Sequence, residues 1–132
     1  MKITADTNVL VRLFMADDVA QSRVAVAAME SASLVAISVH ALCELCWVLA
    51  RHYGVARGDI AVAIRGLVDA RNVSVNRAAV DAGLMVLDAG GDFADGVIAF
   101  EGVWLGGERF VSFDKKAVKL LGTHGKAVQL LG

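Results

Sequence analysis

Hydrophobic residues follow two alternating patterns along this chain: short apolar runs, and longer segments in which they return every three or four positions. The second spacing is typical of a helix with one buried face. The short runs predict five strands, Lys2–Ala5, Leu34–Ile37, Val73–Val75, Arg109–Phe113 and Ala127–Leu130. Because strands that alternate with helices form parallel sheets covered on both faces, the pattern predicts an α/β fold.

Polar capping residues and glycines delimit the predicted helices, since the chain contains no proline. Glycine pairs at 90–91 and 106–107 interrupt the helical spacing, and Gly54 ends another helical segment. The expected helices are Thr7–Ala16, a segment after Asp17 or Asp18 that carries Val24, Ala27 and Ala28, Ser38–Tyr53, Arg57–Ala70, a segment after Asn76 that carries Val80, Leu84 and Leu87, Asp92–Leu105, and Lys115–Leu121.

Size and charge narrow the class of protein. A chain of 132 residues has room for one domain, which we expect to span residues 1–132. With 13 basic and 14 acidic residues, the net charge of −1 does not suit a protein that coats nucleic acid by bulk attraction. The longest stretch without Asp, Glu, Lys or Arg, Ser31–Cys43, is shorter than the ~18 residues of a membrane span. Cys43 and Cys46 lie within one predicted helix, so we expect buried thiols and a reducing cytoplasm.

Aspartates stand where predicted strands give way to helices, or where a helix begins. Asp6 follows the first strand, Asp114 follows the fourth, and Asp95 lies in the first turn of the helix that Asp92 opens. Each has a structural explanation, because aspartate caps helices and suits the positive end of the helix dipole. This explanation fits Asp92 best. Open parallel sheets bind ligands at the carboxyl ends of their strands, so Asp6 and Asp114 are also expected to face such a crevice.

Glu44 is the only charged side chain between Ser31 and Ala50, in a helix that is apolar almost all round. Such a helix is expected to be buried, and a buried glutamate needs a compensating partner. No lysine or arginine lies one helical turn away, although His40 lies within hydrogen-bonding reach. We therefore expect the partner charge to come from elsewhere in the fold or from a metal. Exposure of Glu44 at a gap in the packing is the alternative.

Four carboxylates would repel one another strongly if Asp6, Glu44, Asp95 and Asp114 converged. One like pair at ~4 Å costs roughly 4 kcal/mol at an intermediate dielectric. Such a cluster raises its pKa values or binds a hard divalent cation. Because all the ligands are oxygens, the cation expected is Mg²⁺ or Mn²⁺.

Four segments resemble motifs of the PIN-domain family, and in particular of VapC-type toxins from toxin–antitoxin pairs. The segments are Ile3–Leu10, Ser38–Val48, Asp92–Ala99 and Phe110–Asp114. Their order and spacing match over essentially the whole chain. The resemblance implies a three-layer α/β/α sandwich whose central parallel sheet has the strand order 3-2-1-4-5.

The same resemblance implies an Mg²⁺- or Mn²⁺-dependent ribonuclease that hydrolyses RNA phosphodiester bonds. By motif, Asp6, Glu44, Asp95 and Asp114 would be the catalytic, metal-holding acids. Asn8, Asp92 and Ser112 would support them. The pattern departs at Ser112-Phe113, where many relatives have a threonine and a polar residue. The resemblance further implies a cytoplasmic toxin with a cognate antitoxin as partner, and a homodimer without a membrane segment.

Basic side chains near these motifs are candidates for RNA contacts. Lys115 and Lys116 follow Asp114, and Arg12 lies on the first predicted helix. They would guide the RNA backbone by attraction to phosphate. A solvated helix face is the alternative explanation of the lysines.

Two other functions fit parts of the sequence. A phosphoaspartyl hydrolase also places an aspartate after its first strand, but it needs a second aspartate two residues later, where this chain has Asn8. A catalytically inactive PIN-like interaction module would not need all four acids, and all four are present.

Overall fold

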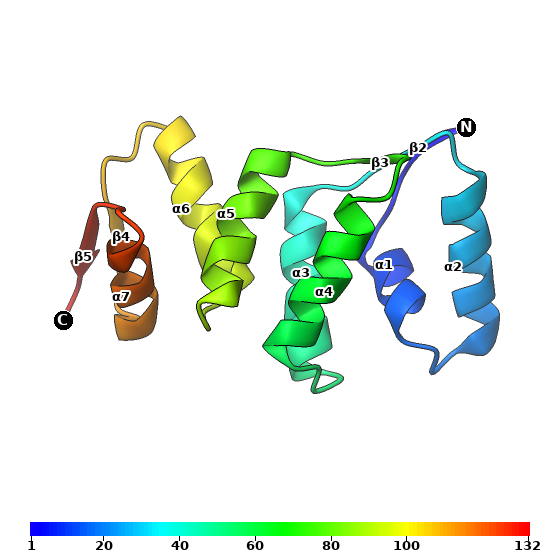
Figure 1. Cartoon of the computed structure of the whole chain (residues 1–132), viewed down its shortest axis with the longest axis horizontal. Coiled ribbons are helices and arrows are strands. Elements are labelled where there is room, and N and C mark those ends of the chain that lie inside the picture. The colour runs from blue at the N-terminus through cyan, green and yellow to red at the C-terminus, as the bar shows by residue number, and fades with distance from the viewer. The chain divides into compact units, whose positions relative to one another are not determined.

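Five short strands and seven helices follow one another in the alternating order that the hydrophobic pattern predicts (Figure 1). The computed structural model describes all 132 residues. The chain divides into two compact units, Met1–Asn76 (unit 1) and Arg77–Gly132 (unit 2), and each is described by itself. A single domain over residues 1–132 stays a prediction.

Unit 1 contains a parallel sheet in the order β1-β2-β3. Its elements are β1 (Lys2–Thr4), α1 (Thr7–Phe14), α2 (Val19–Ser31), β2 (Leu34–Ala36), α3 (Val39–Arg51), α4 (Arg57–Val68) and β3 (Val73–Ser74). The register sets Ile3 beside Val35, and Val35 beside Val73. Since the strands are parallel, the carboxyl ends of β1 and β2 lie at the same edge of this sheet, where α1 and α3 begin.

The helices of unit 1 start at polar caps and pack through their apolar faces. Asp18 Oδ1 accepts a hydrogen bond from the Gln21 backbone N at 3.0 Å, and Ser38 Oγ accepts one from the Ala41 N at 3.1 Å. Helix α1 packs against α2 and α3, and α3 packs against α4 (Figure 1). The fully buried side chains of unit 1 come from α1, β2, α3 and α4 and include Leu10, Val35, Leu42, Leu45, Leu49, Ile60 and Ile64.

Unit 2 contains a tight helix pair and two parallel strands. Its elements are α5 (Arg77–Asp88), α6 (Phe93–Trp104), β4 (Phe110–Ser112), α7 (Lys115–Thr123) and β5 (Val128–Leu130). Gly90 has a φ of +96°, a conformation that favours glycine, and it reverses the chain between α5 and α6. The two helices pack closely because Gly83 lies against the ring of buried Phe93, and Gly96 lies against the backbone of α5.

The elements confirm the predicted α/β class, with boundaries shifted by one or two residues. Helix α3 ends at Arg51 and not at Tyr53, and α4 ends at Val68 and not at Ala70. The Tyr53 hydroxyl instead donates a hydrogen bond to Asp17 at 2.8 Å, beyond the end of the helix. The predicted strand order was 3-2-1-4-5. The observed orders β1-β2-β3 and β4-β5 agree with its two parts, and the pairing of β1 with β4 stays a prediction. None of the helices has the length and apolar content to traverse a bilayer.

Candidate active site

Asp6 stands at the carboxyl end of β1 and is the N-cap residue of α1. Its Oδ1 accepts a hydrogen bond from the backbone N of Thr7 at 2.7 Å, and its side chain is exposed. The second motif begins at the same edge of the sheet, because Ser38 starts α3 directly after the neighbouring strand β2. Asp6 and Glu44 therefore both belong to unit 1, on helices that begin at one sheet edge.

Glu44 is half-exposed, which corrects the expectation of burial. Its side chain is 52% accessible, and its Oε1 lies 2.9 Å from Nε2 of His40, one helical turn earlier. One face of α3 is buried and carries Leu42, Leu45 and Leu49. Because the helical period turns every third or fourth residue to the same side, the opposite face is exposed to solvent and carries His40, Glu44 and Trp47. The partner of Glu44 is thus the histidine on its own helix.

Three aspartates interact electrostatically in unit 2. Asp95, in the first turn of α6, has its pKa raised above the ordinary value, first by burial and then by the negative charges of Asp92 and Asp114. A raised pKa of this origin means that ionised Asp95 is partly dehydrated and repelled by both neighbours. The structure therefore brings together the acids of the third and fourth motifs.

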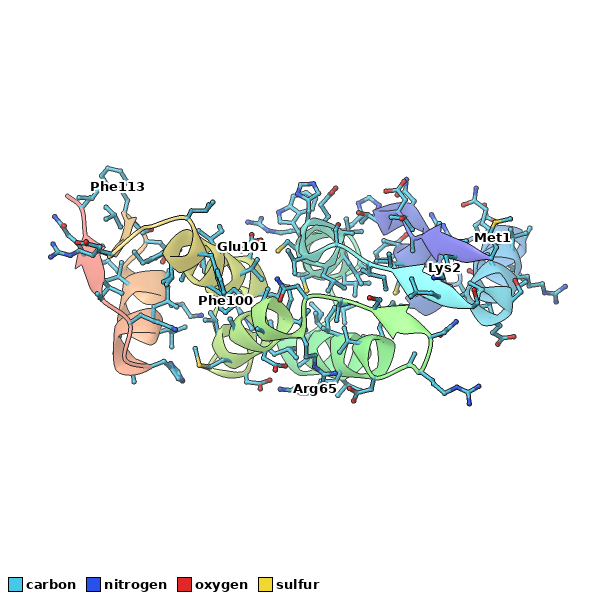
Figure 2. All side chains as sticks on the ribbon, turned by 90° about the horizontal axis from the view of Figure 1, so that it is seen from above. Met1, Lys2, Arg65, Phe100, Glu101 and Phe113 are labelled. Atoms are coloured by element: carbon cyan, nitrogen blue, oxygen red, sulfur yellow. The ribbon has the colours of Figure 1, made fainter.

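Asp114 is held rigidly at the carboxyl end of β4. Its Oδ1 accepts hydrogen bonds from the backbone N of Lys116 at 2.9 Å and of Ala117 at 3.1 Å, so it caps α7. The Asp114 backbone N in turn donates to Ser112 Oγ at 2.9 Å. The ring of Phe113 between them is 76% exposed and points away from the ribbon (Figure 2).

Asp92 does not act as the simple cap that its position suggests. It occupies the N-cap position of α6, but its carboxylate accepts no capping hydrogen bond from that helix. Its charge instead contributes to the raised pKa of Asp95. Asp92 thus stands at the N-cap position as expected, but its side chain does not make the capping hydrogen bond.

Arg12 and Asn8 lie on α1, and the guanidinium is already engaged. Arg12 forms an ion pair with Asp17, and its Nε donates to Gln21 Oε1 at 3.1 Å. Asn8 is exposed and lines a shallow apolar groove between α1 and α2. Arg12 therefore ties α1 to the start of α2, whereas Lys115 and Lys116 in unit 2 have exposed side chains.

The aspartates of unit 2 offer some of the oxygen ligands that a divalent cation requires. The repulsion that helps to raise the pKa of Asp95 would be relieved by a bound cation, and oxygen donors suit Mg²⁺ and Mn²⁺. Within either unit, no three His, Cys, Asp or Glu side chains are placed to hold one ion. The carboxylate oxygens of unit 2 are suitable ligands for such a cation, but they do not complete its coordination shell. Convergence of Asp95 and Asp114 with Asp6 and Glu44 stays a prediction.

The two cysteines lie on α3 and differ in burial. Cys46 is buried, Cys43 is partly exposed, and no disulfide joins them. Burial, with a smaller effect of Cys43, raises the pKa of the Cys46 thiol to about 12. A neutral thiol of this kind is a poor nucleophile. The expectation of buried thiols is confirmed for Cys46 and wrong for Cys43, which is partly exposed.

A comparison with protein families decides the class of protein. The family model of the PIN domain matches residues 3–120. The chain belongs to the PIN-domain family. No protein with a curated description matches it. The matched range contains all four acidic motifs, from Asp6 to Asp114.

PIN domains are nuclease-type folds that act on nucleic acids and generally depend on divalent metal ions.

One residue beside the acids was not expected from the sequence to matter for the site. Gly96 follows Asp95 directly, and its lack of a side chain lets the first turn of α6 approach α5. The only available signal was a glycine inside an apolar helical pattern, which indicates a close contact without naming the partner.

Proposed function

We propose that this PIN domain is a metal-dependent endoribonuclease that hydrolyses RNA phosphodiester bonds and acts as the toxin of a toxin–antitoxin pair. The observation that carries the proposal is the grouping of three aspartates in unit 2, within a chain whose PIN match spans all four acidic motifs: Asp95 is partly buried and feels the charges of Asp92 and Asp114. A protein that used these aspartates only as caps would gain nothing from placing three negative charges within reach of one another. Functional sites are where such unfavourable arrangements are found.

Asp6, Glu44, Asp95 and Asp114 would hold the cation. When bound, Mg²⁺ or Mn²⁺ supplies the Lewis-acid activation of water and phosphate that hydrolysis needs. Asp114 contributes a carboxylate whose orientation is fixed by two backbone amides of α7. Ser112 supports the same residue by accepting the hydrogen bond of its backbone N. Asp92 keeps the pocket negative and so favours cation entry.

The RNA backbone would be bound by Lys115 and Lys116, which follow Asp114 in the first turn of α7 and are exposed. Their ammonium groups attract phosphate without reading its base. This placement is consistent with a chain whose overall charge of −1 gives no bulk attraction for RNA. Arg12 is a weaker candidate, because Asp17 and Gln21 already bind its guanidinium.

The antitoxin would dock on an apolar groove of unit 1, between α1, α2 and α4. The groove has a volume of about 620 Å³. Its apolar lining includes Leu13, Phe14, Val26, Met29, Val62 and Leu67. An amphipathic helix with apolar residues at helical spacing is the kind of segment that fills such a groove.

We also propose that the functional form is a homodimer in the cytoplasm. Light scattering on the purified chain tests the dimer.

The experiment is RNA cleavage by the purified chain with Mg²⁺ or Mn²⁺, with and without EDTA, for Asp95→Asn and a matched control. Asp81→Asn is that control, since Asp81 is exposed in unit 2 and pairs only at the surface with Arg77 at 3.3 Å. Asp95→Asn should reduce cleavage at least about 100-fold, and Asp81→Asn should leave it unchanged. Circular dichroism of both variants verifies the fold.

Cleavage that persists in EDTA, or in Asp95→Asn, would contradict the proposal. Binding of RNA without any cleavage would instead identify an inactive interaction module.

A further inference from the structure

The exposed face of α3 carries four side chains at helical spacing, which we call the α3 stripe. They are His40, Glu44, Trp47 and Arg51, at intervals of four, three and four residues, so they lie along one side of the helix. All four are exposed to solvent. An aromatic ring therefore stands one turn from Glu44 on one side and one turn from an arginine on the other.

Trp47 is an unusual residue to leave in solvent. It is 63% exposed, and it is the only large hydrophobic side chain of α3 that is exposed. Tryptophan is highly buried on average, because its ring carries a large apolar surface. The core of a protein interface is a cluster of apolar anchors, whereas the neighbours of Trp47 on the stripe are charged. A single ring among charged groups suits a nucleobase better, since a base has a flat face that stacks and polar edges.

Arg51 adds a positive charge that is free to bind phosphate. No aspartate or glutamate lies three or four residues from it, and it belongs to none of the ion pairs of the structure. It lies in the last turn of α3, one turn after Trp47 and about 6 Å from it along the helix axis. A base that stacked on Trp47 would bring its own backbone phosphate within reach of this guanidinium, which is a strong phosphate-binding group.

We propose that the α3 stripe binds one unpaired nucleotide of the RNA, with the base stacked on Trp47 and the phosphate held by Arg51. The inference rests on the proposed function, because it takes Glu44 to be one of the metal-holding acids. Glu44 and Arg51 are seven residues apart, about 10 Å along the axis, so the nucleotide would lie next to the bond that is cleaved.

The stacked base defines the class of substrate. Bases within a duplex stack on one another, so an aromatic side chain reaches only the bases of single-stranded segments, loops and ends. Stacking on an aromatic ring tolerates every base, because each has a π face. The α3 stripe would therefore select single-stranded RNA without reading its sequence.

The chain contains two tryptophans, and the second is a matched control. Trp104 is 78% exposed and ends α6, nine residues after Asp95 and about 14 Å from it along the axis. Trp47→Phe and Trp104→Phe each leave one tryptophan, whose fluorescence is then followed alone. With EDTA present to prevent cleavage, a short oligoadenylate should quench Trp47 in the Trp104→Phe variant and leave Trp104 unchanged in the Trp47→Phe variant. The same strand paired with oligouridylate should quench neither.

The affinity for a labelled oligoadenylate, measured by fluorescence anisotropy, gives a second readout. Trp47→Leu should weaken binding about tenfold or more, Trp47→Phe should retain most of the affinity, and Trp104→Leu should bind as the wild type. Arg51→Gln should reduce the slope of log affinity against log salt by about 0.7, the value for one phosphate contact on a single strand. Because Trp47 and Arg51 are exposed, these changes leave the core of unit 1 intact.

Three results would overturn the inference: Trp47 fluorescence that RNA does not quench, equal affinities of Trp47→Leu and Trp104→Leu, or a Trp47→Phe variant that binds as weakly as Trp47→Leu. A Trp47→Leu variant that lost a dimer in light scattering and kept its RNA affinity would identify a protein interface instead.

These readouts are separate from RNA cleavage. Quenching of Trp47 in a protein that cleaves no RNA would keep the nucleotide site and overturn the nuclease, whereas Asp95-dependent cleavage without quenching would do the reverse.

Discussion

Replacing Gly96 by alanine should destabilise the chain, although alanine is the better helix former. A Cβ atom at this position would overlap the carbonyl oxygen of Ala82, and would lie 2.8 Å from both the Ala82 carbonyl carbon and the Gly83 Cα. All three are backbone atoms of α5, so no side chain can rotate away. The only relief is a shift of α6 relative to α5, at the turn that carries Asp95.

The magnitude follows from two opposing effects. Forcing extra atoms into a packed contact costs typically 1–3 kcal/mol, and a contact between two rigid backbones belongs near ~3 kcal/mol. Alanine in place of glycine returns about 1 kcal/mol of helix propensity. The net loss is about 2 kcal/mol of unfolding free energy, or a fall in Tm of roughly 5–10 °C for a chain of this size.

The control is Gly102→Ala in the same helix, where an added Cβ meets no atom within 4 Å. That variant should gain about 0.5–1 kcal/mol, because only the propensity effect remains. Urea unfolding followed by circular dichroism measures both. If Gly96→Ala proved as stable as Gly102→Ala, the close approach of α5 and α6 would be refuted.

Two further predictions concern the aspartates of unit 2. The folded chain holds the Asp95 proton more tightly than the unfolded chain, because burial, Asp92 and Asp114 raise its pKa. Asp95 should therefore contribute a loss of stability as the pH rises from the ordinary aspartate pKa through the raised one. Asp95→Asn should lack this loss and be the more stable protein at neutral pH, as thermal unfolding across the pH range would measure; a less stable variant would contradict it. Asp114→Ala should lose about 1 kcal/mol in urea unfolding, since two amides of α7 lose their acceptor, while Asp114→Asn should lose little because asparagine also caps. Equal stability of the alanine variant and the wild type would show that the cap contributes nothing.

Hydrophobic periodicity and helix-capping residues predicted most of the helices and strands. Asp18, Ser38 and Asp114 cap helices as their residue types and positions indicate. The contact of Gly96 with α5 could not be predicted, because a glycine in one helix does not say which backbone passes beside it.

The candidate site was predicted in part. The acids were expected where strands end and helices begin, and Asp92, Asp95 and Asp114 do interact there. The exposure of Glu44 was expected only as the alternative, because an apolar run indicates a largely buried helix, whereas this helix keeps one open stripe. Long-range assembly depends on packing that no single helix or strand encodes, so the meeting of all four acids stays a prediction.

We propose that Asp6, Glu44, Asp95 and Asp114 hold one divalent cation. The direct measurement is calorimetric titration of Mn²⁺ into the wild type, Glu44→Gln and Asp95→Asn, with circular dichroism to verify each fold. Both variants should lose the same high-affinity binding event, because the proposal makes each of these acids a ligand of one ion. A folded Glu44→Gln variant that bound Mn²⁺ as tightly as the wild type would contradict it.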